Sequence, residues 1–205
     1  MTQIYKVFYN KQVILISNTK DSFLHYQTNA KIINSEDLSH KTIDEFIKNK
    51  SLLNLCVFAT TPVEAFNSLK SLYTPITAAG GLVRNDNDEF LFIFRNGTWD
   101  LPKGKAEKNE TIAETAIREV QEECGIGKLN LIKSITITYH IYNQKDKHFL
   151  KDTHWYLMTT KKNQKLKPQL EEGITELRWF NKEELIEVKA NTYPSVLEII
   201  ESFIE

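Results

Sequence analysis

GKAEKNETIAETAIREVQEECGI, Gly104 to Ile126, predicts a helix with well-marked ends. Thr111 followed three residues later by Glu114 has the spacing of a capping box, and Gly125 is a typical residue just beyond a helix. We therefore expect the helix to begin at Thr111 and to end before Gly125. At about 100° per residue, its apolar residues fall on one face, which would pack on a sheet. These residues are Ala113, Ala116, Ile117, Val120 and Cys124.

Three glutamates share another flank of this predicted helix. With Glu119 as the origin, Glu122 lies at about -60° and Glu123 at about +40° on the helical wheel. Like charges at this spacing cost about 0.2 to 0.5 kcal/mol per pair, and the helix dipole disfavours anions in the last turns. A hard divalent cation takes oxygen ligands and would compensate this repulsion. The alternative interpretation is a solvated acidic flank, with Arg118 balancing one of the charges.

The composition narrows the classes of protein to consider. At 205 residues, 41% hydrophobic and 26% charged, the chain resembles a soluble globular protein, and its formal net charge of -1 does not indicate one that coats nucleic acid or an anionic membrane. Cys56 and Cys124 are the only cysteines, so neither a disulfide framework nor a zinc site is indicated. The first residues contain only VILI as a continuous apolar run, too short for a signal peptide or a membrane span. We expect a cytoplasmic protein.

Residues 1–75 are predicted to form a small α+β domain. Two strands flank a turn at Asn10, and helices at 42–49 and 62–73 enclose a strand at 53–59. The polar segment TNAKIINSEDLSHK is predicted to be a loop. YTPITAAGG carries Pro75 and two adjacent glycines, and we place the domain junction there.

Residues 76–205 form the second predicted domain, which is richer in strands. NDND separates the apolar runs GLVRN and EFLFIFR and predicts a hairpin. Further strands are expected in NLIKSITITYHIYNQ, HFLKDTHWYLMTT and EEGITELRWFN, and two helices at the end, around KEELIEV and YPSVLEIIESFI. The three tryptophans are expected in the core rather than stacked on a base.

Gly104, five residues, Glu110, seven residues and then REVQEECGI resemble the Nudix box, G-x5-E-x7-R-E-U-x-E-E-x-G-U, in which U is aliphatic. Every defined position matches, and the flanking strands extend the resemblance to roughly residues 76–205. The resemblance implies an α/β/α sandwich with a mixed central sheet, in which the box forms a metal-binding loop-helix-loop. It also implies Mg²⁺-dependent hydrolysis of a nucleoside diphosphate linked to another group X, with Mn²⁺ as a substitute cofactor.

Carried over position by position, the resemblance implies that Glu119, Glu122 and Glu123 bind the metal together with the main-chain carbonyl of Lys103. It implies that Glu110 and Arg118 support these ligands, with Arg118 orienting the acids by salt bridges.

A general base must also take the proton from the attacking water. Glu119 is the first choice for this base. Glu172 or Glu171, in QLEEGITE, is the alternative from a later loop, and an exposed acidic turn is the competing interpretation of that loop.

The substrate is indicated only outside the box. The segment that leads into the box, GTWDLPKGK, is called the entry segment. It is similar to the corresponding segment of enzymes acting on dinucleoside polyphosphates and diphosphoinositol compounds, where Lys103 and Lys105 would meet additional phosphates. Solvated loop lysines are the competing interpretation. Tyr142, sixteen residues after the box, stands where a tyrosine is associated with dinucleoside polyphosphate hydrolases. A (di)nucleoside polyphosphate is therefore the favoured small-molecule partner.

Three other functions stay open. One is an ADP-ribose or nucleotide-sugar pyrophosphatase, and another is a non-catalytic Nudix ligand sensor, although such sensors usually lose box glutamates. An RNA 5'-end pyrophosphohydrolase would need a basic groove that the net charge does not indicate, so neither nucleic acid nor a membrane is the expected partner. The N-terminal domain would dimerise the chain, cover the active site or stabilise the fold.

Overall fold

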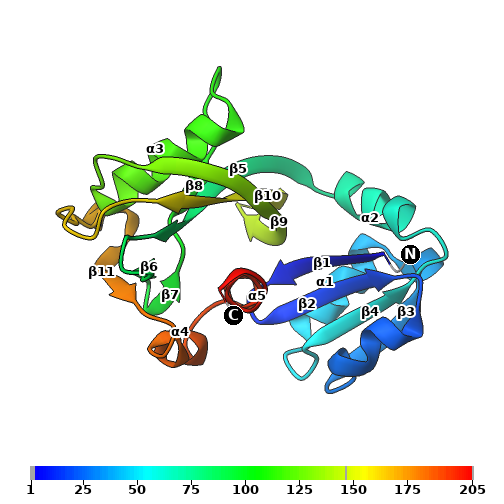
Figure 1. The fold of residues 1–205 in the computed structure, drawn as a ribbon. Helices are drawn as coiled ribbons and strands as arrows, with labels where there is room; N and C mark the ends of the chain where they lie inside the picture. Colours follow the sequence, from blue (N-terminus) through cyan, green and yellow to red (C-terminus); the bar gives the residue numbers. More distant parts are fainter. Residues whose placement is uncertain (1–2, 146, 205) are drawn as a thin grey trace. The chain divides into compact units, whose positions relative to one another are not determined.

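The structure is a computed structural model that describes residues 3–145 and 147–204 (Figure 1). It divides into two units. The first unit comprises Met1–Ile76 and Tyr139–Lys151. The second comprises Thr77–Thr138 and Asp152–Glu205. Within the described residues, every helix is too short or too polar to cross a membrane.

The first unit contains a mixed sheet with the strand order β9-β1-β2-β4-β3, in which β9 is Asn130–Gln144. Strands β1 (Ile4–Tyr9) and β2 (Gln12–Ser17) are antiparallel, and β3 (Ala30–Asn34) and β4 (Asn54–Phe58) run parallel to each other. The loop predicted around residues 28–41 is wrong for β3, because the short apolar run within it pairs with β4.

Helices α1 (His40–Lys48) and α2 (Pro62–Ser71) also belong to the first unit, with short 3-10 helices at Lys20–Tyr26 and Ser35–Asp37. One core joins these helices to the strands. Its members include Val7, Ile14, Phe46, Leu55, Phe66, Ile141 and Leu150. Ile141 lies in β9 and Leu150 in β10 (Lys147–Thr159), so residues from these two strands share the core of the first unit.

The second unit has the strand order β11-β6-β5-β10-β9, with the short strands β7 and β8 beside β6 and β5. The bounds are β5 (Thr74–Arg84), β6 (Phe90–Arg95), β7 (Thr98–Asp100), β8 (Lys103–Lys105), β9 (Asn130–Gln144), β10 (Lys147–Thr159) and β11 (Ile174–Phe180). The antiparallel pairing of β5 with β6 at Arg84 and Phe90 confirms the predicted hairpin. Strands β7 and β8 were not predicted, because they lie inside a segment that reads as a tight loop.

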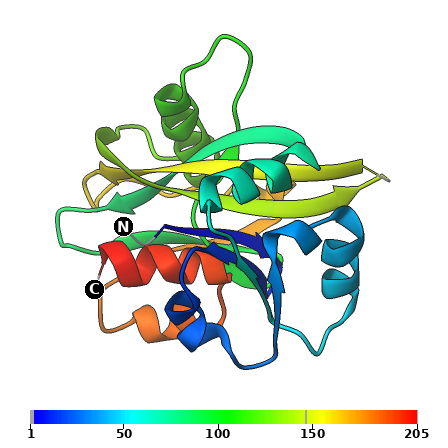
Figure 2. The ribbon, with the colours of Figure 1, turned by 90° about the vertical axis from the view of Figure 1, so that its right-hand side faces the viewer.

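Helices cover both faces of this second sheet. Figure 2 shows α3 (Ile112–Cys124) on one side of the strands and α5 (Pro194–Phe203) on the other. Val120 of α3 packs with Ala79 and Val83 in one cluster. A separate cluster holds α5 and α4 (Leu185–Ala190) against the residues on the opposite face, such as Phe92. This arrangement confirms the expected α/β/α sandwich.

The glycine pair at the predicted junction lies inside β5 and is fully buried in the fold. A Cβ on Gly81 would lie 2.9 Å from both Met158 Sδ and Val120 Cγ2. A Cβ on Gly80 would lie 2.3 Å from the carbonyl oxygen of Pro102. These glycines therefore allow close packing of the sheet with α3 and the β8 segment, and they do not form a flexible linker.

Candidate active site

Helix α3 has the ends that its sequence predicts. Thr111 Oγ1 accepts a hydrogen bond from the Glu114 N–H at 3.2 Å, and Glu114 Oε2 accepts one from the Thr111 N–H at 2.9 Å. This reciprocal pair confirms the capping box. The helix ends at Cys124, and Gly125 follows in the left-handed conformation with φ 68°.

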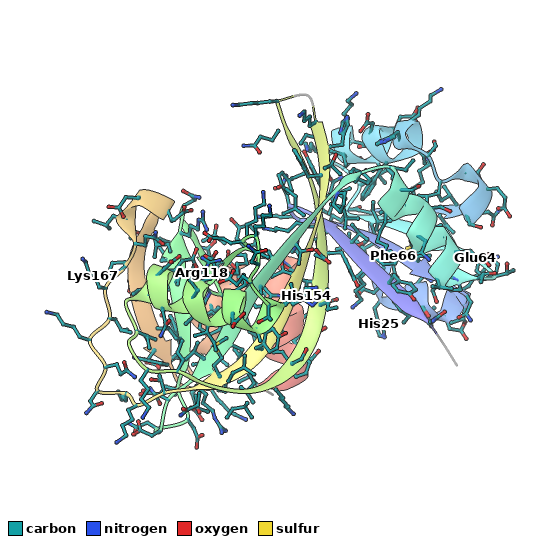
Figure 3. All side chains as sticks on the ribbon, turned by 90° about the horizontal axis from the view of Figure 1, so that it is seen from above. His25, Glu64, Phe66, Arg118, His154 and Lys167 are labelled. Atoms are coloured by element: carbon teal, nitrogen blue, oxygen red, sulfur yellow. The ribbon has the colours of Figure 1, made fainter. Side chains whose placement is uncertain are left out.

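Arg118, labelled in Figure 3, is the centre of the acidic flank. Its Nε and Nη2 donate to the two oxygens of Glu110 at 2.8 and 3.0 Å. Its Nη1 donates to Glu119 Oε1 at 2.8 Å and to Glu122 Oε2 at 3.0 Å, and Nη2 also donates to the Lys105 carbonyl at 3.1 Å. All five N–H groups of the guanidinium thus have an acceptor. The structure thus brings three of the four glutamates that the motif defines, Glu110, Glu119 and Glu122, around the guanidinium of Arg118.

Glu110 fixes the loop before α3 as well as the arginine. Its Oε2 accepts from Thr115 Oγ1 at 2.7 Å and from the Glu107 N–H at 3.2 Å. The hydrogen bonds from Arg118 are the main reason why the pKa of Glu110 falls to about 2. Glu110 is therefore ionised near neutral pH.

Glu119 lies against the backbone of β8. A Cβ on Gly104 would lie 2.0 Å from Glu119 Oε2 and 2.2 Å from its Cδ, so no other residue fits at position 104 without moving the carboxylate. Burial raises the pKa of Glu119, and the adjacent Arg118 opposes this shift. The glycine that begins the box thus makes room for the carboxylate of Glu119.

Glu122 and Glu123 have different surroundings. The Glu122 side chain is 50% exposed, whereas that of Glu123 is 3% exposed. Glu123 Oε2 accepts from the Lys103 N–H at 2.9 Å, and its Oε1 accepts from Arg95 Nη1 at 3.2 Å. Burial raises the pKa of Glu123 to about 7, although Lys103 and Arg95 act in the opposite direction.

Arg95, the last residue of β6, was not identified from the sequence. Its Nη2 donates to Glu172 Oε2 at 2.7 Å, so one side chain contacts both the box helix and the later acidic turn. That turn is a short 3-10 helix, Leu170–Glu172, in which Glu171 is exposed. The available signal was a single cation at the end of the apolar run EFLFIF.

The two lysines of the entry segment differ in their surroundings. Lys103 Nζ pairs with the carboxylate of Asp100 and donates to the Leu101 carbonyl at 3.3 Å. Asp100 is buried and was not identified from the sequence. The Lys105 side chain is exposed. The ammonium group of Lys103 is thus engaged within the protein, while its main chain contacts Glu123.

Tyr142 belongs to the first unit, unlike the box. Its ring stacks on Phe149 with centroids 5.3 Å apart and an interplanar angle of 23°, and partial burial raises its pKa. Trp99 and Trp155 are buried in the second unit, which confirms that they are core residues.

The donor atoms of the acidic flank fit a hard divalent cation. Within residues 3–145 and 147–204, no three His, Cys, Asp or Glu side chains already converge as a metal site. Glu119 and Glu122 nevertheless share the same nitrogen of Arg118, so their carboxylates lie on one side of α3. Carboxylate oxygens of this kind are the donors that Mg²⁺ and Mn²⁺ prefer.

Comparison with known proteins gives one family and several relatives. The NUDIX domain family model matches residues 74–203. A Mycobacterium tuberculosis (strain CDC 1551 / Oshkosh) protein, named as a candidate 8-oxo-dGTP diphosphatase, is 33% identical over 70 residues, which are 34% of this chain and 30% of that protein. The chain thus spans about 30% of the length of the curated relatives it matches.

Several solved structures are similar to part of the chain. An Ap4A hydrolase binary complex from C. elegans is 22% identical with a TM-score of 0.49, covering 63% of this chain and 95% of the other. A MutT protein from Methanosarcina mazei Go1 is 25% identical with a TM-score of 0.45, covering 64% and 94%. A bifunctional NMN adenylyltransferase/ADP ribose pyrophosphatase from Francisella tularensis, complexed with AMP and Mn ion, is 17% identical with a TM-score of 0.48, covering 69% and 44%.

The family match includes the whole of the second unit's box helix and its flanking sheet, where the arginine and glutamates of the motif meet. Because that match covers more than half of the 205 residues, the chain belongs to the Nudix family.

Proposed function

We propose that this chain is a pyrophosphohydrolase that cleaves a phosphoric anhydride bond in a nucleoside polyphosphate and requires a divalent cation. The observation that carries the proposal is the shared hydrogen bonding of Glu119 and Glu122 to Arg118 Nη1, at 2.8 and 3.0 Å. An arginine that is itself fixed by Glu110 holds these two carboxylates on the same side of α3. Two like charges three residues apart on a helix repel each other, and a bound ligand of opposite charge would offset this repulsion.

Glu119, Glu122, Glu123 and the carbonyl of Lys103 would hold the cation, and Mg²⁺ is the expected one, with Mn²⁺ as a substitute. When bound, a divalent cation neutralises the phosphate oxygens and makes a nearby water more acidic. Arg118 keeps the acids oriented, and Gly104 keeps the space beside Glu119 open.

Two glutamates are candidates for the group that takes the proton from the attacking water. Glu119 lies inside the box network with its side chain 13% exposed. The Glu172 side chain is 49% exposed and is bonded to Arg95. Glu172→Ala tests the later-loop candidate, because loss of the base lowers turnover by about 10²- to 10⁴-fold, whereas Glu119→Ala also removes a proposed ligand of the cation. Full activity in Glu172→Ala would leave Glu119 as the base.

The substrate class rests on the entry segment and on the relatives. The resemblance of GTWDLPKGK to the entry segment of dinucleoside polyphosphate enzymes supports a (di)nucleoside polyphosphate, for which Lys105 is the proposed contact. The 33% identity with the candidate 8-oxo-dGTP diphosphatase favours an oxidised nucleoside triphosphate as the second candidate. Both substrates contain the same phosphoric anhydride.

The test is a panel of purified compounds assayed with Mg²⁺, with Mn²⁺ and with a chelator. The panel contains diadenosine polyphosphates, nucleoside triphosphates including 8-oxo-dGTP, ADP-ribose and nucleotide sugars. We expect metal-dependent release of a nucleotide and a phosphate product from a polyphosphate. Tight binding of one compound without turnover of any would instead indicate a ligand sensor.

A further inference from the structure

Arg95 links two carboxylates from separate elements of the second unit. Its Nη1 lies 3.2 Å from Glu123 Oε1 in α3, and its Nη2 lies 2.7 Å from Glu172 Oε2 in the acidic turn. The arginine side chain is 28% exposed, between a buried partner and a half-exposed one. One planar guanidinium thus spans the gap between the box helix and the turn.

The main chain on both sides of Glu172 is fixed by other bonds. Before it, the N–H of Gln169 donates to the Glu123 carbonyl at 3.2 Å. After it, Gly173 adopts φ 73°, and Ile174 pairs with Arg95 in the ladder between β11 and β6. The backbone of the turn therefore stays beside α3 whatever its side chains do.

These backbone bonds do not fix the orientation of the Glu172 carboxylate. Side chains at an exposed turn sample several rotamers, and a half-exposed ion pair contributes little to stability. The bond to Arg95 selects the rotamer that points toward the Glu123 side of α3. Its effect is thus expected in the geometry of the site rather than in the stability of the fold.

We propose that Arg95 is a positioning residue, which orients the Glu172 carboxylate toward the box glutamates by bridging it to Glu123. This inference rests on the proposed function for its kinetic consequence. Its structural consequence is independent of any activity.

The kinetic test is a double-mutant cycle with Arg95→Gln and Glu172→Gln. We expect Glu172→Gln alone to lower kcat by about tenfold or more with little change in KM, as for a group that acts on the reacting atoms. In the Arg95→Gln background the same change should lower kcat by less than about twofold, because the carboxylate is already misplaced. The proposal would be overturned if the kcat losses of Arg95→Gln and Glu172→Gln simply multiplied in the double variant. Loss of activity in Glu171→Gln with none in Glu172→Gln would also overturn it.

Matched controls separate positioning from charge and from folding. Arg84→Gln removes an arginine from a surface pair with Asp88, and Glu176→Gln removes an exposed carboxylate from β11. Both should keep the activity of the unmodified chain. Arg95→Lys should recover part of the activity, because a single ammonium can meet one carboxylate but does not span two.

A second measurement needs no turnover. In a crystal structure of Arg95→Gln, the Glu172 carboxylate should turn away from the Glu123 side of α3, while the main chain of residues 170–173 stays in place; in Arg84→Gln the carboxylate should keep its orientation. Arg95→Met keeps the aliphatic part of the side chain and serves where Arg95→Gln folds poorly. A Glu172 carboxylate that keeps its orientation without the guanidinium contradicts the proposal, whereas a turned carboxylate in a protein that hydrolyses nothing would contradict only the proposed function.

Discussion

Gly104 is the position at which an added side chain would disturb the site most directly. A Cβ added there would lie 2.0 Å from Glu119 Oε2, whereas one added at Gly127 would meet no described atom closer than Gln164 Oε1 at 3.7 Å. We expect Gly104→Ala to lower kcat by about 100-fold, the cost of displacing a reacting group by roughly 1 Å. Gly127→Ala should stay within about 0.5 kcal/mol of the unmodified chain in stability. Steady-state kinetics and urea unfolding check this pair, and equal activities would contradict the role given to Gly104.

The pairing of Glu110 with Arg118 predicts a pH dependence of stability. The pKa of Glu110 is lowered from 4.5 to about 2, chiefly by the hydrogen bonds from Arg118. A folded-state pKa below the unfolded value means that ionised Glu110 stabilises the fold above about pH 4.5, and that this stabilisation is lost as the pH falls toward 2.

Glu110→Gln should therefore be less stable than the unmodified chain at about pH 7, and the difference should narrow at about pH 3. Urea unfolding at both pH values measures it, with the exposed Glu201→Gln as control. A difference that stays constant with pH would show that the carboxylate is not held in its ionised form.

The residues of the Arg118 network could be predicted because they lie close together in the sequence. Glu110, Arg118 and Glu119 meet within one loop and helix, so their contacts follow from the helical repeat and the motif. The bond from Arg95 to Glu172 joins residues 77 positions apart. No local pattern encodes such a pair, since strand pairing between β6 and β11 brings them together.

At the scale of elements, the C-terminal end of α3 organises the loop that carries the acidic turn. Lys167 and Gln169 donate to the carbonyls of Cys124 and Glu123, at 2.9 and 3.2 Å. Helix carbonyls at this end have no partner within the helix, so these bonds satisfy them. The loop is thereby fixed on the helix that carries the box.

Gly125 is required for this attachment. Its φ is 68°, and an added Cβ would lie 2.7 Å from Lys167 Cβ. Gly97 has a similar φ of 79° with no described atom near an added Cβ, so Gly97→Ala isolates the backbone cost of about 1 kcal/mol. We expect Gly125→Ala to cost about 1 to 3 kcal/mol more than Gly97→Ala, because of overpacking against Lys167. Urea unfolding of the two variants compares them, and equal losses would contradict the packing role of Gly125.

Helix limits were easier to predict than short strands. The capping box and Gly125 are local signals, and the observed α3 follows them. Strand β3 has five residues and lies within a polar segment, so its identity depends on a partner that comes later in the chain. Strand β8 is shorter still, and its three residues pair with β5, which comes about 20 residues earlier in the chain.

At the scale of the whole molecule, we propose that the two units unfold separately, because each has its own core. All three tryptophans, Trp99, Trp155 and Trp179, lie in the second unit, so their fluorescence reports on that unit. Leu150 is buried in the first core, and Ile199 is buried in the second.

Leu150→Ala should destabilise the first unit by about 2 to 5 kcal/mol. Its unfolding should then move to lower urea by far-ultraviolet circular dichroism, with little change in tryptophan fluorescence. Ile199→Ala is the counterpart and should shift the fluorescence transition. Coincident shifts of both signals in both variants would show that the units unfold as one.

The central claim is that the box glutamates form a cation site for hydrolysis, and Glu122 tests it most directly. Its side chain is 50% exposed, so Glu122→Gln should change stability by no more than about 0.5 kcal/mol. The measurement is the Mg²⁺-dependent kcat/KM of Glu122→Gln on the best polyphosphate of the panel, beside Glu201→Gln. We expect a loss of about 100-fold or more in Glu122→Gln and none in Glu201→Gln. Equal, metal-dependent rates in both variants would contradict the claim.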